Sequence, residues 1–175
     1  MYASRIAASR RPRHVLTAVA TALLILSPVG HAEDFAPYGT ASSDLRPYPK
    51  LDLVFDVNYE DPTQLHVLYD FVMNSLRHVT GRKIVVTHGP ELRVFAKEAY
   101  EEYQGIVDRM AELAGEGVEF RMCNDAMRAS GFTAEDMHGF ITVISSGFPE
   151  IALLQSQGFR YINPVPLRLE PVPRD

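Results

Sequence analysis

Cys123 is the only cysteine in the 175-residue sequence, and its position points directly to chemistry. It stands between an apolar segment, residues 118–122, expected to form a strand, and residues 124–130, expected to form a short helix. Amides at a helix N-terminus stabilise a thiolate, which is nucleophilic and can carry sulfur as a persulfide or be oxidised. The alternative is a small buried apolar residue, the usual state of an isolated cysteine.

Polar residues also follow the other expected strands, where ligands bind in open parallel sheets. His88 is a candidate acid–base partner for the thiolate, and the alternative is a turn histidine that only binds backbone groups of its own loop. The remaining candidate binding residues, predicted from position alone, are Asn58, Asn124, Ser145 and Ser146.

Several kinds of site are disfavoured by the motifs. A single cysteine forms no intrachain disulfide and no Cys-rich zinc site. The histidines lack metal-pair spacing, so we predict no metal site and no cofactor. The loop at His88 lacks the glycines and Lys-Ser/Thr pair of a phosphate loop, and Ser145–Ser146 lacks the Gly-x-Ser-x-Gly frame.

Strand and helix patterns alternate along the chain between residues 51 and 164. Apolar runs predict strands, helical spacing of apolar residues predicts helices between them, and residues 90–97 fit either a short helix or an irregular segment. This order predicts a single α/β domain with flavodoxin- or Rossmann-like layering, in which helices cover both faces of a mostly parallel five-stranded sheet. The expected strands are residues 51–57, 83–87, 118–122, 140–144 and 159–162.

The N-terminal 32 residues have the pattern of a secretory signal peptide. Four arginines precede an uncharged apolar run over residues 15–26, and Gly30 and Ala32 stand at positions −3 and −1 of a cut before Glu33. The alternative is a retained anchor, for which the run is short. We therefore expect a periplasmic or secreted protein with no stable membrane span after cleavage. Residues 33–50 read as an extended lead-in, and residues 165–175 as a Pro-rich tail.

The charge balance of the mature chain disfavours one class of partner. Removing residues 1–32 removes four arginines and no acidic residue, which leaves 13 basic against 22 acidic side chains. Proteins that bind nucleic-acid backbones present a cationic face, so we expect no nucleic-acid partner. Small molecules or other proteins are the expected partners.

Four segments, taken in order, resemble the DsrE/DsrF-like family. The resemblance implies a small parallel α/β fold of five strands, homo-oligomers that are commonly trimers or hexamers, and, in the best understood cytoplasmic members, a sulfur relay carried by a cysteine after the third main strand. Cys123 matches that cysteine, whereas Asn58 and His88 match recurring turns. The predicted export signal is a difference from the family members with known sulfur relays, which are cytoplasmic. The segments are VFDVNYEDP (54–62), VVTHGPELRVF (85–95), GVEFRMCNDAMRASGF (117–132) and SSGFPEIALLQSQGFRYINP (145–164).

These observations leave three hypotheses open. In the first, Cys123 is a persulfide carrier or sulfurtransferase residue that exchanges sulfur with small sulfur species or a protein acceptor. In the second, the same fold is a non-catalytic module that binds a small ligand or assembles into oligomers. In the third, Cys123 is a thiol redox sensor that forms an intermolecular disulfide.

Overall fold

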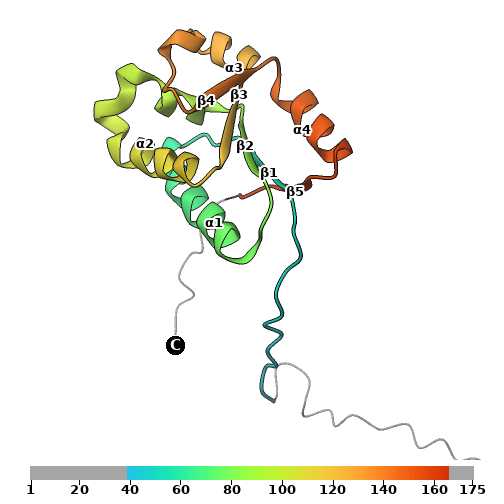
Figure 1. The fold of residues 1–175 in the computed structure, drawn as a ribbon. Helices are drawn as coiled ribbons and strands as arrows, with labels where there is room; N and C mark the ends of the chain where they lie inside the picture. Colours follow the sequence, from blue (N-terminus) through green and yellow to red (C-terminus); the bar gives the residue numbers. More distant parts are fainter. Residues whose placement is uncertain (1–38, 166–175) are drawn as a thin grey trace, which may run out of the picture. The chain divides into compact units, whose positions relative to one another are not determined.

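Five parallel strands in the order β4-β3-β2-β1-β5 form the sheet of the computed structural model, which describes residues 39–165 (Figure 1). This arrangement confirms the predicted single-domain α/β fold. The elements are β1 (Leu53–Val57), α1 (Leu65–His78), β2 (Lys83–Thr87), α2 (Tyr100–Gly115), β3 (Glu119–Cys123), α3 (Asn124–Ala129), β4 (Ile141–Ile144), α4 (Gly147–Ser156) and β5 (Arg160–Ile162).

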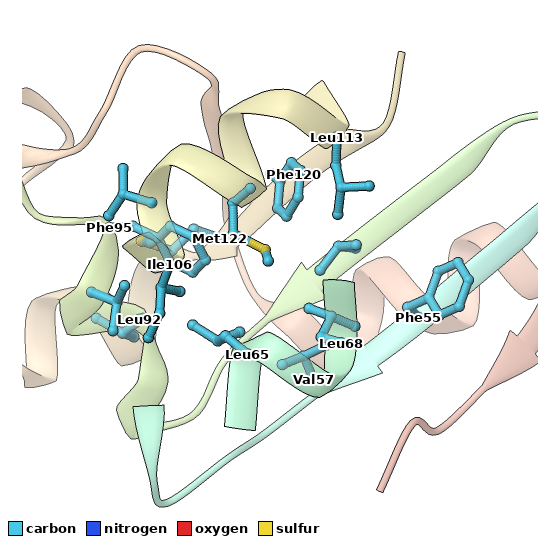
Figure 2. Close-up of a cluster of buried hydrophobic side chains, with 14 of the residues drawn as sticks. Phe55, Val57, Leu65, Leu68, Leu92, Phe95, Ile106, Leu113, Phe120 and Met122 are labelled. Atoms are coloured by element: carbon cyan, nitrogen blue, oxygen red, sulfur yellow. The ribbon is translucent and has the colours of Figure 1, made fainter. Parts of the chain in front are cut away.

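Helices α1 and α2 cover one face of the sheet, and α4 covers the other (Figure 1). On the α1/α2 face, alternate strand residues such as Phe55, Val85 and Phe120 join a large apolar core with Leu68 and Leu113 of the two helices (Figure 2). Because successive strand residues point to opposite faces, the residues between them face α4. We call these two sides the α1/α2 face and the α4 face.

The core on the α4 face is smaller. It consists of six buried residues, three from β1 and β2 and three from α4 and the turn that follows it, with Ile144 packed against them: Val54, Ile84, Val86, Ile151, Leu154 and Phe159. One helix of ten residues therefore packs against four strands, β1, β2, β3 and β5, on this side. The reduced cover leaves room for polar side chains at the carboxyl ends of the strands.

Local sequence explains how the loops around these strand ends are built. Asp61 accepts a hydrogen bond from the amide of Thr63, and Pro62 begins a short 3-10 turn that leads into α1. The ambiguous segment after β2 forms a 3-10 helix over Pro90–Phe95 whose apolar side is buried in the main core. Cys123 is the last residue of β3, so α3 begins directly after it.

Some sequence-based expectations fall outside the described residues. The predicted signal peptide lies there, as do residues 33–38 and all of the predicted tail except Val165. Residues 39–50 contain no helix or strand, and their side chains are exposed. Across residues 39–165, no helix is long and apolar enough to cross a membrane.

Candidate functional site

An aspartate–histidine pair lies at the carboxyl edge of the sheet on the α4 face. Nε2 of His88, which follows β2, is 2.6 Å from Oδ1 of Asp56 in β1. The other carboxylate oxygen of Asp56 accepts a hydrogen bond of 2.6 Å from the hydroxyl of Tyr161 in β5. The His88 side chain is only 7% exposed and that of Asp56 15%. Three strands thus hold one hydrogen-bonded chain of side chains.

The pair holds its two members in their charged forms. The hydrogen bond from His88 lowers the pKa of Asp56, against the opposing effect of burial. The same hydrogen bond raises the pKa of His88, again against burial, and the negative charges of Asp56 and Glu91 add to the increase. The hydrogen bond to Asp56 raises the pKa of Tyr161, which therefore remains a proton donor. Both shifts favour the charged forms of the pair, the Asp56 carboxylate and the His88 imidazolium.

Cys123 lies beside His88 on the same face of the sheet. Thr87 pairs with Met122, so the next residue of each segment, His88 and Cys123, are lateral neighbours on adjacent strands spaced roughly 5 Å apart. Arg121, two residues before Cys123, forms an ion pair with Glu150 of α4, which shows that both residues point to the α4 face. Cys123 is a free thiol and is 5% exposed.

The N-terminus of α4 packs directly on His88. A Cβ atom added to Gly147, the first residue of α4, would lie 3.0 Å from Cβ of His88, so this position has room for little more than glycine. The ring of Phe148 packs at a tilt on the imidazole, with 4.7 Å between ring centroids. Together with Asp56, these contacts fix the orientation of the His88 ring.

A buried carboxylate, Glu91, ties together the loops that follow β1 and β2. It is fully buried and accepts hydrogen bonds from the amide of Tyr59 at 2.8 Å and the amide of Gly89 at 3.1 Å, and from the hydroxyl of Thr87. A Cβ atom on Gly89 would lie 2.2 Å from Oδ1 of Asn58, so the two loops touch where glycine is required. Glu91 therefore positions both Asn58 and His88.

Two cavities meet at Asn58 and His88, which line both. The first, about 400 Å³, is also lined by Asp56, Glu60 and Phe148, and we call it the acidic cavity. The second, about 550 Å³, lies against α3, and its further lining includes Arg93 but no carboxylate, so we call it the basic cavity. Cys123 lines neither cavity.

The remaining sequence-predicted residues lie apart from this pair of cavities. Asn124 lines a separate hollow with Arg128 and Phe132. Ser145 and Ser146 line another with Pro149 and Leu153, between the end of β4 and the start of α4. The structure therefore brings Asn58 and His88 to the same two cavities, places Cys123 on the strand beside His88, and leaves the other three residues at different surfaces.

Sequence reasoning missed the partners that make His88 more than a turn histidine. Asp56 had a detectable signal, because it is a charged residue inside an otherwise apolar strand, Leu53–Val57. Tyr161 and Glu91 gave none, since each acts through contacts with residues distant in the chain or inside a 3-10 turn. Within residues 39–165, no three His, Cys, Asp or Glu side chains are grouped so that they could hold a metal ion.

A family model and solved structures of other proteins match this chain. The model of the DsrE/DsrF-like family matches residues 71–164. A protein of unknown function from Methanobacterium thermoautotrophicum, MTH1491, is 30% identical with a TM-score of 0.58, over 65% of this chain and 99% of that one. A conserved protein of unknown function from Bacteroides thetaiotaomicron, BT1422, is 18% identical with a TM-score of 0.46, over 64% of this chain and 93% of that one. No curated protein matches.

Proposed function

Because this chain belongs to the DsrE/DsrF-like family, we propose that it is an exported sulfur-handling protein in which Cys123 accepts sulfane sulfur and passes it on. The observation that carries the proposal is the placement of Cys123 beside the Asp56–His88 pair, on one face of the sheet and at the edge where ligands bind. The thiol has a proton-transfer group next to it, which a structural cysteine does not need.

The chemical step needs no oxidant or reductant. The thiolate of Cys123 attacks the terminal sulfur of an organic persulfide, R–S–SH, and forms a new S–S bond. The donor's own S–S bond breaks, its electron pair leaves with R–S⁻, and Cys123 becomes a persulfide. In this proposal His88, whose charged form is favoured by its contact with Asp56, protonates the leaving thiolate. Transfer to an acceptor thiol is the same exchange in the opposite direction.

A second candidate is a binding module without chemistry. The observation that favours it is that the cavities are lined by Asn58 and His88 but not by Cys123, whose exposure is low. In that case His88 and Asp56 hold a small polar ligand and the thiol is only part of the core. The redox-sensor alternative has less support, because an intermolecular disulfide requires a thiol that another chain can reach.

We also propose that the chain works outside the cytoplasm as a homo-oligomer, a trimer or a hexamer. Exposed apolar side chains on the α4 face support association, namely Phe148 and Leu153 of α4 with Tyr161 of β5. Amino-terminal sequencing of the protein from a periplasmic or culture fraction tests export, and we expect it to begin at Glu33. Light scattering tests assembly, and a monomer would contradict it.

Intact-mass spectrometry tests the sulfur chemistry directly. We expect the reduced protein, incubated with glutathione persulfide or polysulfide, to gain steps of about 32 Da, one sulfur atom each. Cys123→Ser should gain none. His88→Gln should slow the gain on the order of 100-fold, because the proton donor is lost, whereas His66→Gln on the exposed side of α1 should load normally.

Two results separate the candidates. A wild-type protein that never gains sulfur would refute the proposed chemistry. If that protein still bound small ligands at Asn58 and His88, as seen by shifts of their amide resonances, the binding module would be the better description.

A further inference from the structure

The basic cavity and the acidic cavity offer opposite electrostatic surroundings on the two sides of His88. Asp56 and Glu60 line the acidic cavity, and no arginine or lysine lines it. Arg93 and His88 are the ionisable side chains that line the basic cavity. An anionic molecule that approaches His88 is therefore repelled on one side and attracted on the other.

Arg93 is available for such a molecule. Other arginines near the sheet are committed to carboxylates: Arg82 binds Glu119, and Arg121 binds Glu119 and Glu150. Arg93 forms no ion pair in the part of the chain that the structure describes. Its guanidinium lies near the hydroxyl of Tyr103, whose pKa is raised by the Glu102 carboxylate and lowered by Arg93. An exposed guanidinium without a carboxylate partner can bind a ligand carboxylate through two parallel hydrogen bonds.

The basic cavity also has the size and position that a donor molecule needs. Its volume of about 550 Å³ is in the range of small-molecule sites. Small side chains on α3, Ala126, Ala129 and Ser130, form one wall, and the turn at Gly89 and Pro90 forms another. Since α3 begins directly after Cys123 and His88 is the lateral neighbour of Cys123, this cavity is lined by the residue beside Cys123 and by the helix that follows it.

We infer that the basic cavity binds the organic part of the sulfur donor, and that this donor is a low-molecular-weight persulfide carrying a carboxylate that Arg93 recognises. The inference rests on the proposed function, since it names the substrate class for sulfur transfer to Cys123. The carboxylate lies at Arg93, the body of the donor lies along α3, and the terminal sulfur reaches past His88. A donor with a cationic group in place of the carboxylate lacks this contact.

Loading rates with two donors test the inference. Glutathione persulfide carries carboxylates, whereas cysteamine persulfide carries an ammonium group. We expect Arg93→Gln to slow sulfur gain from glutathione persulfide about tenfold, the loss of one charge-assisted contact, and not to slow sulfur gain from cysteamine persulfide, whose ammonium group Arg93 repels. Arg128→Gln is the matched control, because Arg128 is an exposed arginine on α3 that lines neither cavity. Equal slowing with both donors, or no slowing, would overturn the inference.

A binding measurement separates this inference from the proposed chemistry. S-methylglutathione cannot transfer sulfur, and we expect it to shift the amide resonances of Ala126 and Ser130 in the wild type but not in Arg93→Gln. Binding without any sulfur gain from either persulfide would refute the sulfur chemistry and leave the carboxylate site standing. Sulfur gain without these amide shifts would overturn the site and leave the chemistry standing.

Discussion

Alternate residues of the same strands face two different surroundings in this protein. Val57, Thr87 and Met122 point to the α1/α2 face, where two long helices bury a continuous apolar core. Asp56, together with His88 and Cys123 at the ends of the neighbouring strands, faces α4, where one short helix covers a core of six residues. Residues of the apolar core and residues of the candidate site are thus immediate neighbours in the sequence of each strand.

This contrast shows how a small α/β domain separates stability from chemistry. The α1/α2 face excludes water over a large apolar area, which supplies most of the favourable free energy of folding. The α4 face leaves charged groups partly covered, so they form hydrogen-bonded pairs whose pKa values shift. A substitution should therefore affect mainly stability on the first face and mainly proton transfer or binding on the second.

The largest expected effect comes from removing an aromatic ring from the α1/α2 face. Phe120 is 1% exposed and packs against Phe95 and Phe140. We expect Phe120→Ala to reduce the free energy of unfolding by about 3–5 kcal/mol, measured by urea denaturation, because it loses buried area and leaves a cavity. The control is Phe148→Ala on the α4 face, which is 68% exposed and should change stability far less. Similar losses of unfolding free energy in the two variants would contradict the proposed difference between the two faces.

An intermediate effect is expected at Glu91, whose buried carboxylate connects the loops that follow β1 and β2. Glu91→Ala leaves the buried amides of Tyr59 and Gly89 without their acceptor, and we expect a loss of about 2–4 kcal/mol in urea denaturation. Glu91→Gln keeps an acceptor oxygen and similar volume, so it should lose less. Glu98→Ala, at an exposed position, serves as the control. An unchanged free energy of unfolding in Glu91→Ala would show that these hydrogen bonds between the loops do not stabilise the fold.

The smallest effect concerns pH and the Asp56–His88 pair. Because the pKa of His88 is raised on folding, its contribution to stability is complete below its unfolded pKa and disappears as pH rises through the folded value. Because the pKa of Asp56 is lowered, its contribution is present above the ordinary pKa of an aspartate carboxyl group and disappears as pH falls through the folded value. The pair is therefore most stabilising at a pH above the unfolded pKa of Asp56 and below the unfolded pKa of His88.

The variant Asp56→Asn tests this pH dependence. We expect the pKa of His88, followed by NMR titration of its ring proton, to fall, because the hydrogen-bonding carboxylate is lost. The decrease in unfolding free energy between pH 6 and pH 9 should also become smaller than in the wild type. Asp70→Asn, on the exposed side of α1, should leave the titration of His88 as it is. A His88 titration that does not move in Asp56→Asn would contradict the assigned pairing.

Sequence periodicity located the elements closely because local rules govern them. The predicted strand over residues 83–87 coincides with β2, and Asp61 caps the first helical segment with Pro62 at its first position. Thr133 and Asp136, three residues apart, form a capping box at another short helical turn. The segment over residues 90–97 remained ambiguous, since a 3-10 turn with buried residues on one side has neither clear helical nor clear strand periodicity.

The sequence by itself determined the order of strands and helices, the alternation that sends neighbouring residues to opposite faces, and the position of the thiol where a strand ends. Only the tertiary structure decided which polar residues meet. Asp56 and His88 are 32 residues apart, and Asp56 and Tyr161 are 105 apart. Their contacts depend on β1 lying between β2 and β5. Strand order follows from the packing of all helices against the sheet at once, and no local pattern in the chain encodes it.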